Sequence, residues 1–378
     1  MSTSVGQFGS SGASLILNAS IQKLTQAQSQ IAWQTSTQTI GETFADLGPN
    51  RATALSLAPK ISQVTSWQNN ITQAQSSLKI TASALQQIAS LAQNMATNLL
   101  SMSGTSGSSS TATNSYAAQA QSALTELTSA LNTSDGTGYV FAGNASNEKP
   151  LQGNASLSES TLATQIAAIV NPTPKTPSPL NASSIMKNVT SATNDDKRIF
   201  ASTLYASGNP ATTTQNPQQA ASSQRYTVIS SGETMQIGVV ATQGNASDVS
   251  STSTGSPIST GSPIKDLMRD LMVVSSMSGM SSDTSGYADL VKQLHASLTT
   301  TVSQITNMET TIGTQQNTLT ARASLLASMQ TSLQTQLSNA RSVDVAQVAI
   351  HSQDVNTSLK ASFILISDMK DMSLANYI

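Results

Sequence analysis

The clearest pattern along the chain is a seven-residue repeat of apolar positions in the N-terminal third. One row of residues recurs at every seventh position, and a companion row three residues further on is apolar except for one threonine. Positions of this kind, sustained over six heptads, are typical of one long helix that packs along another. We therefore predict a helix from about Ala54 to Ser103. The seam residues of the first row are Leu57, Val64, Ile71, Leu78, Leu85, Ala92 and Leu99.

A second heptad row lies towards the other end of the sequence and provides a partner of similar length. Its companion row is more polar than that of the first helix. Because burial of one Leu or Ile is worth roughly 1.5–3 kcal/mol, the two rows together predict a pair of long antiparallel helices. The seam residues of the second row are Leu298, Ile305, Ile312, Leu319, Leu326 and Leu333, followed by Ala340.

Two further amphipathic segments lie outside these helices. Their apolar residues are spaced by three, four or seven, and the heptad phase slips after Ala340, which predicts a break between inner and outer segments. The local sequence offers little to bury these stripes, so we expect them to be poorly ordered in a monomer and to fold against equivalent helices of neighbouring copies. The stripe residues are Leu17, Ile21, Leu24, Ile31, Val348, Val355, Leu359, Ile366, Met369, Leu374, Tyr377 and Ile378.

The middle of the chain loses the heptads and is rich in turn residues. Four prolines between Asn171 and Pro179 exclude a helix or a central strand there. Elsewhere the patterns predict short elements. In chain order they are a connector at Gly104–Asn114, a helix at Ala117–Leu131, a strand at Tyr139–Phe141, a strand hairpin of Tyr226–Ile229 with Met235–Val240, and a helix at Ile264–Val274.

Together these elements predict a mainly α fold. Long antiparallel coiled-coil-like helices come from both termini, and a mixed, partly β insert domain lies at the centre. The expected domains are terminal assembly helices at 1–44 plus 341–378, a helical rod domain at 45–150 plus 264–340, and a surface-exposed insert at 151–263.

The amino-acid composition narrows the range of possible functions. Only 10% of the residues are charged, against roughly 25% in an average domain, and such neutral polar surfaces suit faces that end up against other protein. A net charge of −2 argues against nucleic acid, which needs a basic footprint. The start of the chain lacks the pattern of a cleaved secretory signal, and no window reaches the roughly 18 apolar residues of a membrane helix.

Candidate chemistry is sparse. The chain has no cysteine, and its two histidines, His295 and His351, lack a second ligand at metal-binding spacing. We therefore expect no metal, no cofactor and no catalytic site. The densest charge cluster, Asp195–Arg198, is interpreted as a solvated helix start.

Two local motifs add a resemblance. The segment Asn132–Gly143 followed by Asn147–Leu151 places a glycine turn before an aromatic stretch, an Ala-Gly pair and a Pro-Leu pair. The C-terminal stretch from Asp344 to Ile378 begins near a Val-Asp pair and ends in a short apolar tail. With the terminal heptads, these motifs resemble the bacterial flagellin family, which includes flagellin and flagellar hook-associated protein type 3, over residues 15–150 and 265–378.

The resemblance implies a structural subunit of the flagellar axial structure outside the cell. It further implies export by the flagellar type III apparatus, an export chaperone that shields the C-terminal helix, and polymerisation with copies of itself or related axial proteins. Within the family, the Asn-Tyr-Ile ending and Tyr139–Gly143 favour the hook–filament junction protein, with the main filament flagellin as the alternative.

From another class, a secreted translocator or tip protein of a virulence-type secretion system would need a long apolar hairpin, which the sequence lacks. An adhesive role or glycosylation of the insert stays open.

Overall fold

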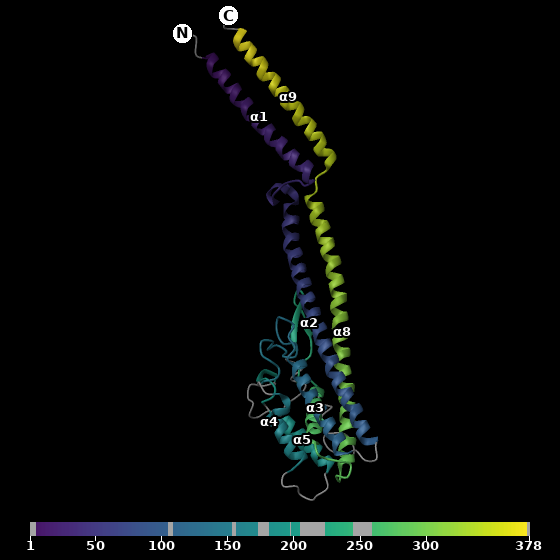
Figure 1. The fold of residues 1–378 in the computed structure, drawn as a ribbon. Helices are drawn as coiled ribbons and strands as arrows, with labels where there is room; N and C mark the ends of the chain where they lie inside the picture. Colours follow the sequence, from purple (N-terminus) through teal and green to yellow (C-terminus); the bar gives the residue numbers. More distant parts are fainter. Residues whose placement is uncertain are drawn as a thin grey trace. The chain divides into compact units, whose positions relative to one another are not determined.

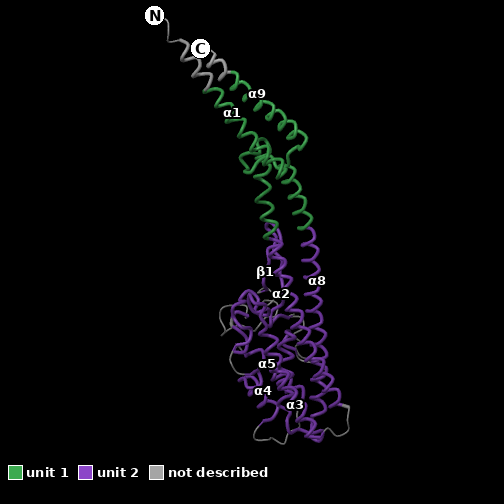
Figure 2. Tube along the Cα trace, turned by 45° about the horizontal axis from the view of Figure 1, so that its top comes forward, with its two compact units in different colours: residues 1–66, 326–378 green, residues 67–325 purple. Residues whose placement is uncertain are grey.

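The computed structural model of the chain describes residues 5–104, 109–152, 156–172, 181–196, 198–204, 224–244 and 259–375. The predicted mainly α fold is confirmed: long helices dominate (Figure 1), and the sheet formed by the described residues is a two-stranded hairpin. The chain divides into two compact units, residues 1–66 with 326–378 and residues 67–325 (Figure 2). They are called unit 1 and unit 2 below.

Unit 1 contains both terminal helices. The helix α1 lies side by side with α9, so the two ends of the chain pair with each other (Figure 1). The ends of the inner helices meet in the same unit, where Gln330 Nε2 donates to Thr65 Oγ1 at 3.1 Å. The elements of unit 1 are α1 (Val5–Thr37), the 3-10 helix η1 (Phe44–Asn50), the start of α2 (Arg51–Gly104), the end of α8 (Tyr287–Arg341) and α9 (Val345–Ala375).

The break between α8 and α9 falls at residues 342–344, just after the predicted slip of the heptad phase. Asp344 begins the new helix, because its Oδ1 accepts from the backbone N–H of Ala346 at 2.9 Å and of Gln347 at 3.4 Å. A carboxylate that satisfies the free N–H groups of the first turn is a standard helix start. At the N-terminal side, Asp46 Oδ2 accepts from Thr43 N–H and Oγ1 at 3.0 and 2.7 Å and so shapes the start of η1.

Unit 2 contains the remainder of α2 and α8, which run side by side (Figures 1 and 2), and the shorter elements between them. Across the pair, Gln75 Nε2 donates to Thr320 Oγ1 at 3.1 Å. The shorter elements are α3 (Ser110–Leu131), η2 (Leu157–Glu159), α4 (Thr161–Val170), α5 (Ala182–Asp195), η3 (Ser202–Leu204), β1 (Arg225–Ser230), β2 (Glu233–Ile237) and α7 (Pro263–Ser276).

The helix α7 is enclosed within unit 2. Every residue from Pro263 to Val274 is buried, and the helix contacts α3, α4 and α5. Two helices of the expected insert, α4 and α5, therefore pack on a helix that the sequence assigned to the rod domain. The three-part division of the chain stays a prediction and is taken up as a proposal below.

The predicted hairpin is confirmed as β1 and β2, which pair antiparallel. Its second strand is shorter than predicted and ends at Ile237. Gly238 turns the chain there at a φ of 78°, and its N–H donates to Gln315 Oε1 of α8 at 3.0 Å instead of extending the ladder. At the hairpin turn, Glu233 forms an ion pair with Arg322 of α8.

Three local predictions were wrong. Part of the connector Gly104–Asn114 is helical, because Ser109 Oγ accepts from Ala112 N–H and starts α3 seven residues before Ala117. The stretch Tyr139–Phe141 is a turn with one isolated bridge from Tyr139 to Ser134, because none of the described strands pairs with it. The cluster Asp195–Arg198 ends a helix rather than starting one, because Asp196 Oδ1 accepts from the N–H of Arg198 and Ile199 and turns the chain out of α5.

Most residues of the two heptad rows are buried. The predicted seam residues other than Leu333 and Ala340 are at most 5% exposed, and these two are half-buried. The buried ones are Leu57, Val64, Ile71, Leu78, Leu85, Ala92, Leu99, Leu298, Ile305, Ile312, Leu319 and Leu326. The companion positions Ala74, Thr81, Ile88, Met95 and Met102 are buried too. Thr81, the one polar residue of that row, donates its hydroxyl to Ser77 O of its own helix at 2.8 Å and so needs no partner across the seam.

A charge at the seam should unfold the helix pair. In Leu78→Asp, an unpaired carboxylate replaces a side chain that is 1% exposed, and we expect the free energy of unfolding to fall by about 3–5 kcal/mol. Denaturant titration followed by circular dichroism measures the change. The matched control is Lys79→Asp at the exposed neighbouring position, which should stay within about 0.5 kcal/mol of the parent. Equal midpoints for the two variants would contradict the pairing.

Candidate assembly surface

The apolar stripe of α1 is only half covered. Leu17, Ile21, Leu24 and Ile31 are each partly exposed in a helix that contacts α9, and none of them is buried. On α9, Val348 and Leu359 are buried and Val355 is half-buried. The pairing of α1 with α9 therefore shelters these helices less completely than α2 and α8 shelter each other.

The structure places both termini in helices, α1 and α9. Whether they are ordered in a solution monomer stays a prediction. Of the other predicted assembly residues, Ile366 is exposed on α9. Met369 and Leu374 belong to α9 by their backbone, and Tyr377 and Ile378 lie outside the described residues.

Several large apolar side chains of this helix pair are open to solvent. Phe363, Ile364 and Leu365 of α9 are 58%, 62% and 54% exposed, and Leu15 and Ile16 of α1 are more exposed still. Val345 and Ile350 of α9 are exposed as well. Single exposed apolar residues are ordinary, but a cluster of them marks an interaction surface.

The sequence carried a signal for this cluster that the stripe analysis missed. Residues 363–366 read Phe-Ile-Leu-Ile. Successive helical residues point about 100° apart, so a helix that packs on one partner cannot bury four consecutive side chains. Such a run on a helix therefore predicts exposed apolar surface wherever only one face is covered.

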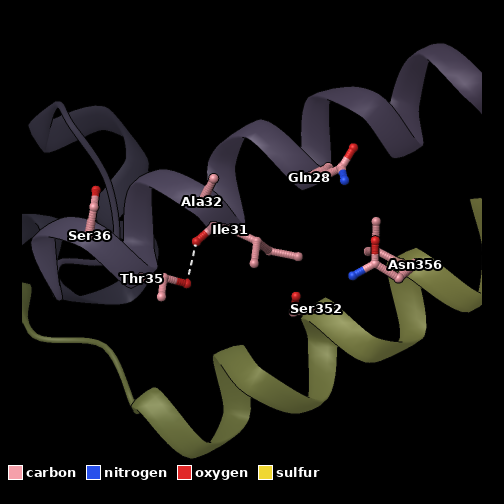
Figure 3. A pocket seen from close by; sticks show the side chains of 8 residues that line it. Gln28, Ile31, Ala32, Thr35, Ser36, Ser352 and Asn356 are labelled. Carbon is pink, nitrogen blue, oxygen red and sulfur yellow. Dashed lines mark hydrogen bonds between the residues drawn. The ribbon is translucent and has the colours of Figure 1, made fainter.

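A notch lies between α1 and α9. It is a hollow of about 420 Å³ (Figure 3). Ile31 points from α1 towards α9, and Asn356 points from α9 towards α1 (Figure 3). The lining carries no charged side chain and consists of Gln28, Ile31, Ala32, Thr35, Ser36, Ser352, Val355 and Asn356.

The two chain segments that connect this helix pair to α2 and α8 are joined by backbone hydrogen bonds. Ile40 N–H donates to Arg341 O at 2.7 Å, and Val343 N–H donates to Gln38 O at 3.1 Å, which forms a short antiparallel bridge. Gln38 has a φ of 55°, an uncommon conformation for a residue other than glycine. The guanidinium of Arg341 lies 5.8 Å from the ring centroid of Phe44 and adds a cation–π contact to the same junction.

In unit 2, the turn that carries the Asn132–Gly143 motif is fastened by Asp135. Its Oδ1 accepts from the N–H of Thr137 and Gly138, and its Oδ2 forms an ion pair with Arg225 of β1 at 3.1 Å. Burial acts to raise the pKa of Asp135, but hydrogen bonds from Ser77, Thr137 and Arg225 hold it well below its ordinary value. The motif therefore joins α2 to the hairpin and has a structural role.

A buried ionic cluster, which the sequence analysis did not anticipate, lies on α7. Arg269 is fully buried and donates to Asp266 Oδ1 at 2.9 Å and to Asp270 Oδ1 at 2.7 Å. The same guanidinium reaches Thr190 Oγ1 of α5 at 2.9 Å and Ser297 Oγ of α8 at 2.7 Å. One side chain thus connects three helices. The only sequence signal was charge at spacings of one and three residues within an otherwise apolar helix.

Burial sets the titration of this cluster. It raises the pKa of Asp270 to about 6 against the opposing effect of the Arg269 guanidinium. Burial alone would lower the pKa of Arg269, but the carboxylates of Asp270 and Asp266 hold it above its ordinary value. Burial lowers the pKa of Lys265 to about 8, although Asp266 and Asp196 act in the other direction.

Metal-binding and membrane-spanning features were searched over the described part of the chain. No group of three or more His, Cys, Asp or Glu side chains there is placed to hold a metal ion. No helix in those ranges has the length and apolar content needed to cross a bilayer.

No protein-family model and no curated protein matches the sequence. Among solved structures, a protein of Vibrio parahaemolyticus provisionally named as flagellar hook-associated is similar to it. The two are 11% identical, the match covers 79% of this chain and 100% of that chain, and the TM-score is 0.48. A likeness this weak does not establish a shared fold or function.

Removing the central cation of the buried cluster should be costly. Arg269→Met leaves two buried aspartates without their partner, and we expect a loss of about 3–5 kcal/mol in the free energy of unfolding. Denaturant unfolding measures it. Arg198→Met makes the same substitution at an exposed position and should change stability by less than about 0.5 kcal/mol. Comparable effects at both sites would show that the cluster contributes little.

Lys265 should give stability a specific pH dependence. Its folded pKa of about 8 lies below the ordinary value of 10.5, so between these values the unfolded chain binds more protons than the folded one. The free energy of unfolding should then rise from pH 8 to pH 10.5 and lose this contribution as the pH falls through 8. Unfolding titrations across this range should show a flatter profile for Lys265→Met. Parallel profiles for parent and variant would contradict the assignment.

Proposed function

We propose that this chain is a structural subunit of the bacterial flagellar axial structure and polymerises through its terminal helices. The observation that carries the proposal is the contrast within one chain. The seam of α2 and α8 is buried, whereas α1 and α9 leave apolar residues such as Ile16 and Phe363 more than half exposed. A chain that can bury one apolar row so well is expected to bury the other against a further copy.

The resemblance of two sequence motifs to the flagellin family indicates which kind of assembly this would be. The segments Asn132–Leu151 and Asp344–Ile378 and the terminal heptads support membership of the flagellin family. On this proposal the chain is secreted by the flagellar type III apparatus with an export chaperone on its C-terminal helix. Its partners are copies of itself, flagellin or hook-associated proteins. The proposed division is assembly helices at 1–44 and 341–378, a rod domain at 45–150 and 264–340, and a surface insert at 151–263.

Within the family we favour the hook–filament junction protein, and the main filament flagellin is the alternative. The ending Asn376–Ile378 and the stretch Tyr139–Gly143 support this choice. Copy number on isolated filaments separates the two, because a junction ring holds few copies and a filament holds thousands. A secreted translocator or tip protein is the rival from another class, and it would act on membranes rather than polymerise.

Removal of Leu359–Ile378 should abolish polymerisation and leave unit 2 folded. The deletion takes away the exposed cluster of α9 but no residue of unit 2. Sedimentation and electron microscopy at high concentration should show polymer for the parent and monomer for the truncated chain, and circular dichroism should show that the helices of unit 2 persist. If the truncated chain polymerises at the parent's rate, the terminal helices are not the assembly surface.

A further inference from the structure

The notch between α1 and α9 is chemically suited to an apolar side chain. Its floor carries Ile31 and Val355, both half-buried. Two of the hydroxyls around it already donate within their own helix, Thr35 Oγ1 to Ile31 O at 2.8 Å and Ser36 Oγ to Trp33 O at 2.9 Å. These hydroxyls do not require a polar guest, and the lining offers no charge to bind an ion.

The same helix pair carries a side chain of matching kind. Phe363 follows Asn356 by seven residues, so it lies on the flank of α9 that borders the notch, two turns further along. At 1.5 Å per residue this separation is about 10 Å. Because α9 is one continuous helix, Phe363 cannot fold back into the notch of its own chain.

We propose that Phe363 of one copy inserts into the notch of a second copy of this chain. Each copy then offers one projecting ring and one hollow that its own ring cannot fill. The exposed residues next to Phe363, Ile364 and Leu365, extend the contact beyond the ring. A surface that supplies both halves of a contact is the usual basis of self-association. The interface rests on the proposed function and specifies the residues through which the terminal helices meet.

A few well-packed residues near the centre of a protein interface carry most of its binding energy. Phe363→Ser, which removes the ring, should therefore raise the concentration needed for assembly by roughly 30-fold. Ser352→Leu, which fills the notch within its own chain, should have a similar effect. The matched control is Leu100→Ser in unit 2, where the side chain is 57% exposed against 58% for Phe363. Sedimentation over a concentration series measures assembly, and circular dichroism confirms that all variants are folded.

Cross-linking tests the contact directly, because the chain has no cysteine of its own. Differently tagged chains carrying Asn356→Cys and Ser367→Cys are mixed, assembled and treated with a short bismaleimide. We expect a cross-linked pair containing both tags. Ser129→Cys on the exposed face of α3 in unit 2 replaces Ser367→Cys as the control and should give no such pair with Asn356→Cys.

The possible outcomes test the proposed interface and the proposed function separately. A parent that polymerises, with parent-like assembly of Phe363→Ser and Ser352→Leu and no mixed cross-link, overturns this interface and leaves the proposed function standing. A parent that remains monomeric at every concentration overturns both. Loss of assembly in both variants but not in Leu100→Ser, together with the mixed cross-link, supports the interface. A hollow that serves another protein or a small molecule would leave self-assembly of Ser352→Leu unchanged.

Discussion

The apolar seam between α2 and α8 is the contact on which the rest of the fold depends. With only 10% of its residues charged, the chain has few ion pairs to hold long helices together. Most surface hydroxyls of α8 are also committed to their own helix, as when Thr310 and Thr314 donate to carbonyls four residues earlier. Burial of the seam therefore supplies most of the attraction between the two helices, and the shorter elements of unit 2 are built on this pair.

The buried cluster on α7 complements that seam. Its hydrogen bonds depend on angle and so fix how the helices are oriented, whereas apolar contact only draws them together. A guanidinium satisfies its donors at fixed angles. Arg269 meets Thr190 and Ser297 from two different helices, so α5 and α8 are held at defined positions around α7. Burial of these charges favours one arrangement of the helices more than it adds to stability.

The long helices could be predicted from the sequence because a sustained heptad needs no knowledge of the partner. Shorter elements depended on contacts that no local pattern records. Tyr139–Phe141 has the composition of a strand, yet no strand in the described ranges pairs with it. The spacing of Asp266, Arg269 and Asp270 allowed ion pairs within α7, but it did not predict their burial. Thr190, which accepts a hydrogen bond from Arg269, lies 79 positions away in the sequence. At the candidate assembly surface, the exposed run Phe363–Ile366 could be predicted from the sequence. The notch could not, because it forms only where two helices far apart in the sequence lie together.

The bonded segments at residues 38–43 and 342–344 have a mechanical consequence. Since Val343 N–H donates to Gln38 O, neither of these two segments can move without displacing the other. A force on one terminal helix is therefore transmitted to both backbone segments, and α1 and α9 would tilt together as one rigid pair. A load on either end of this helix pair would then be divided between the two covalent backbones that cross here.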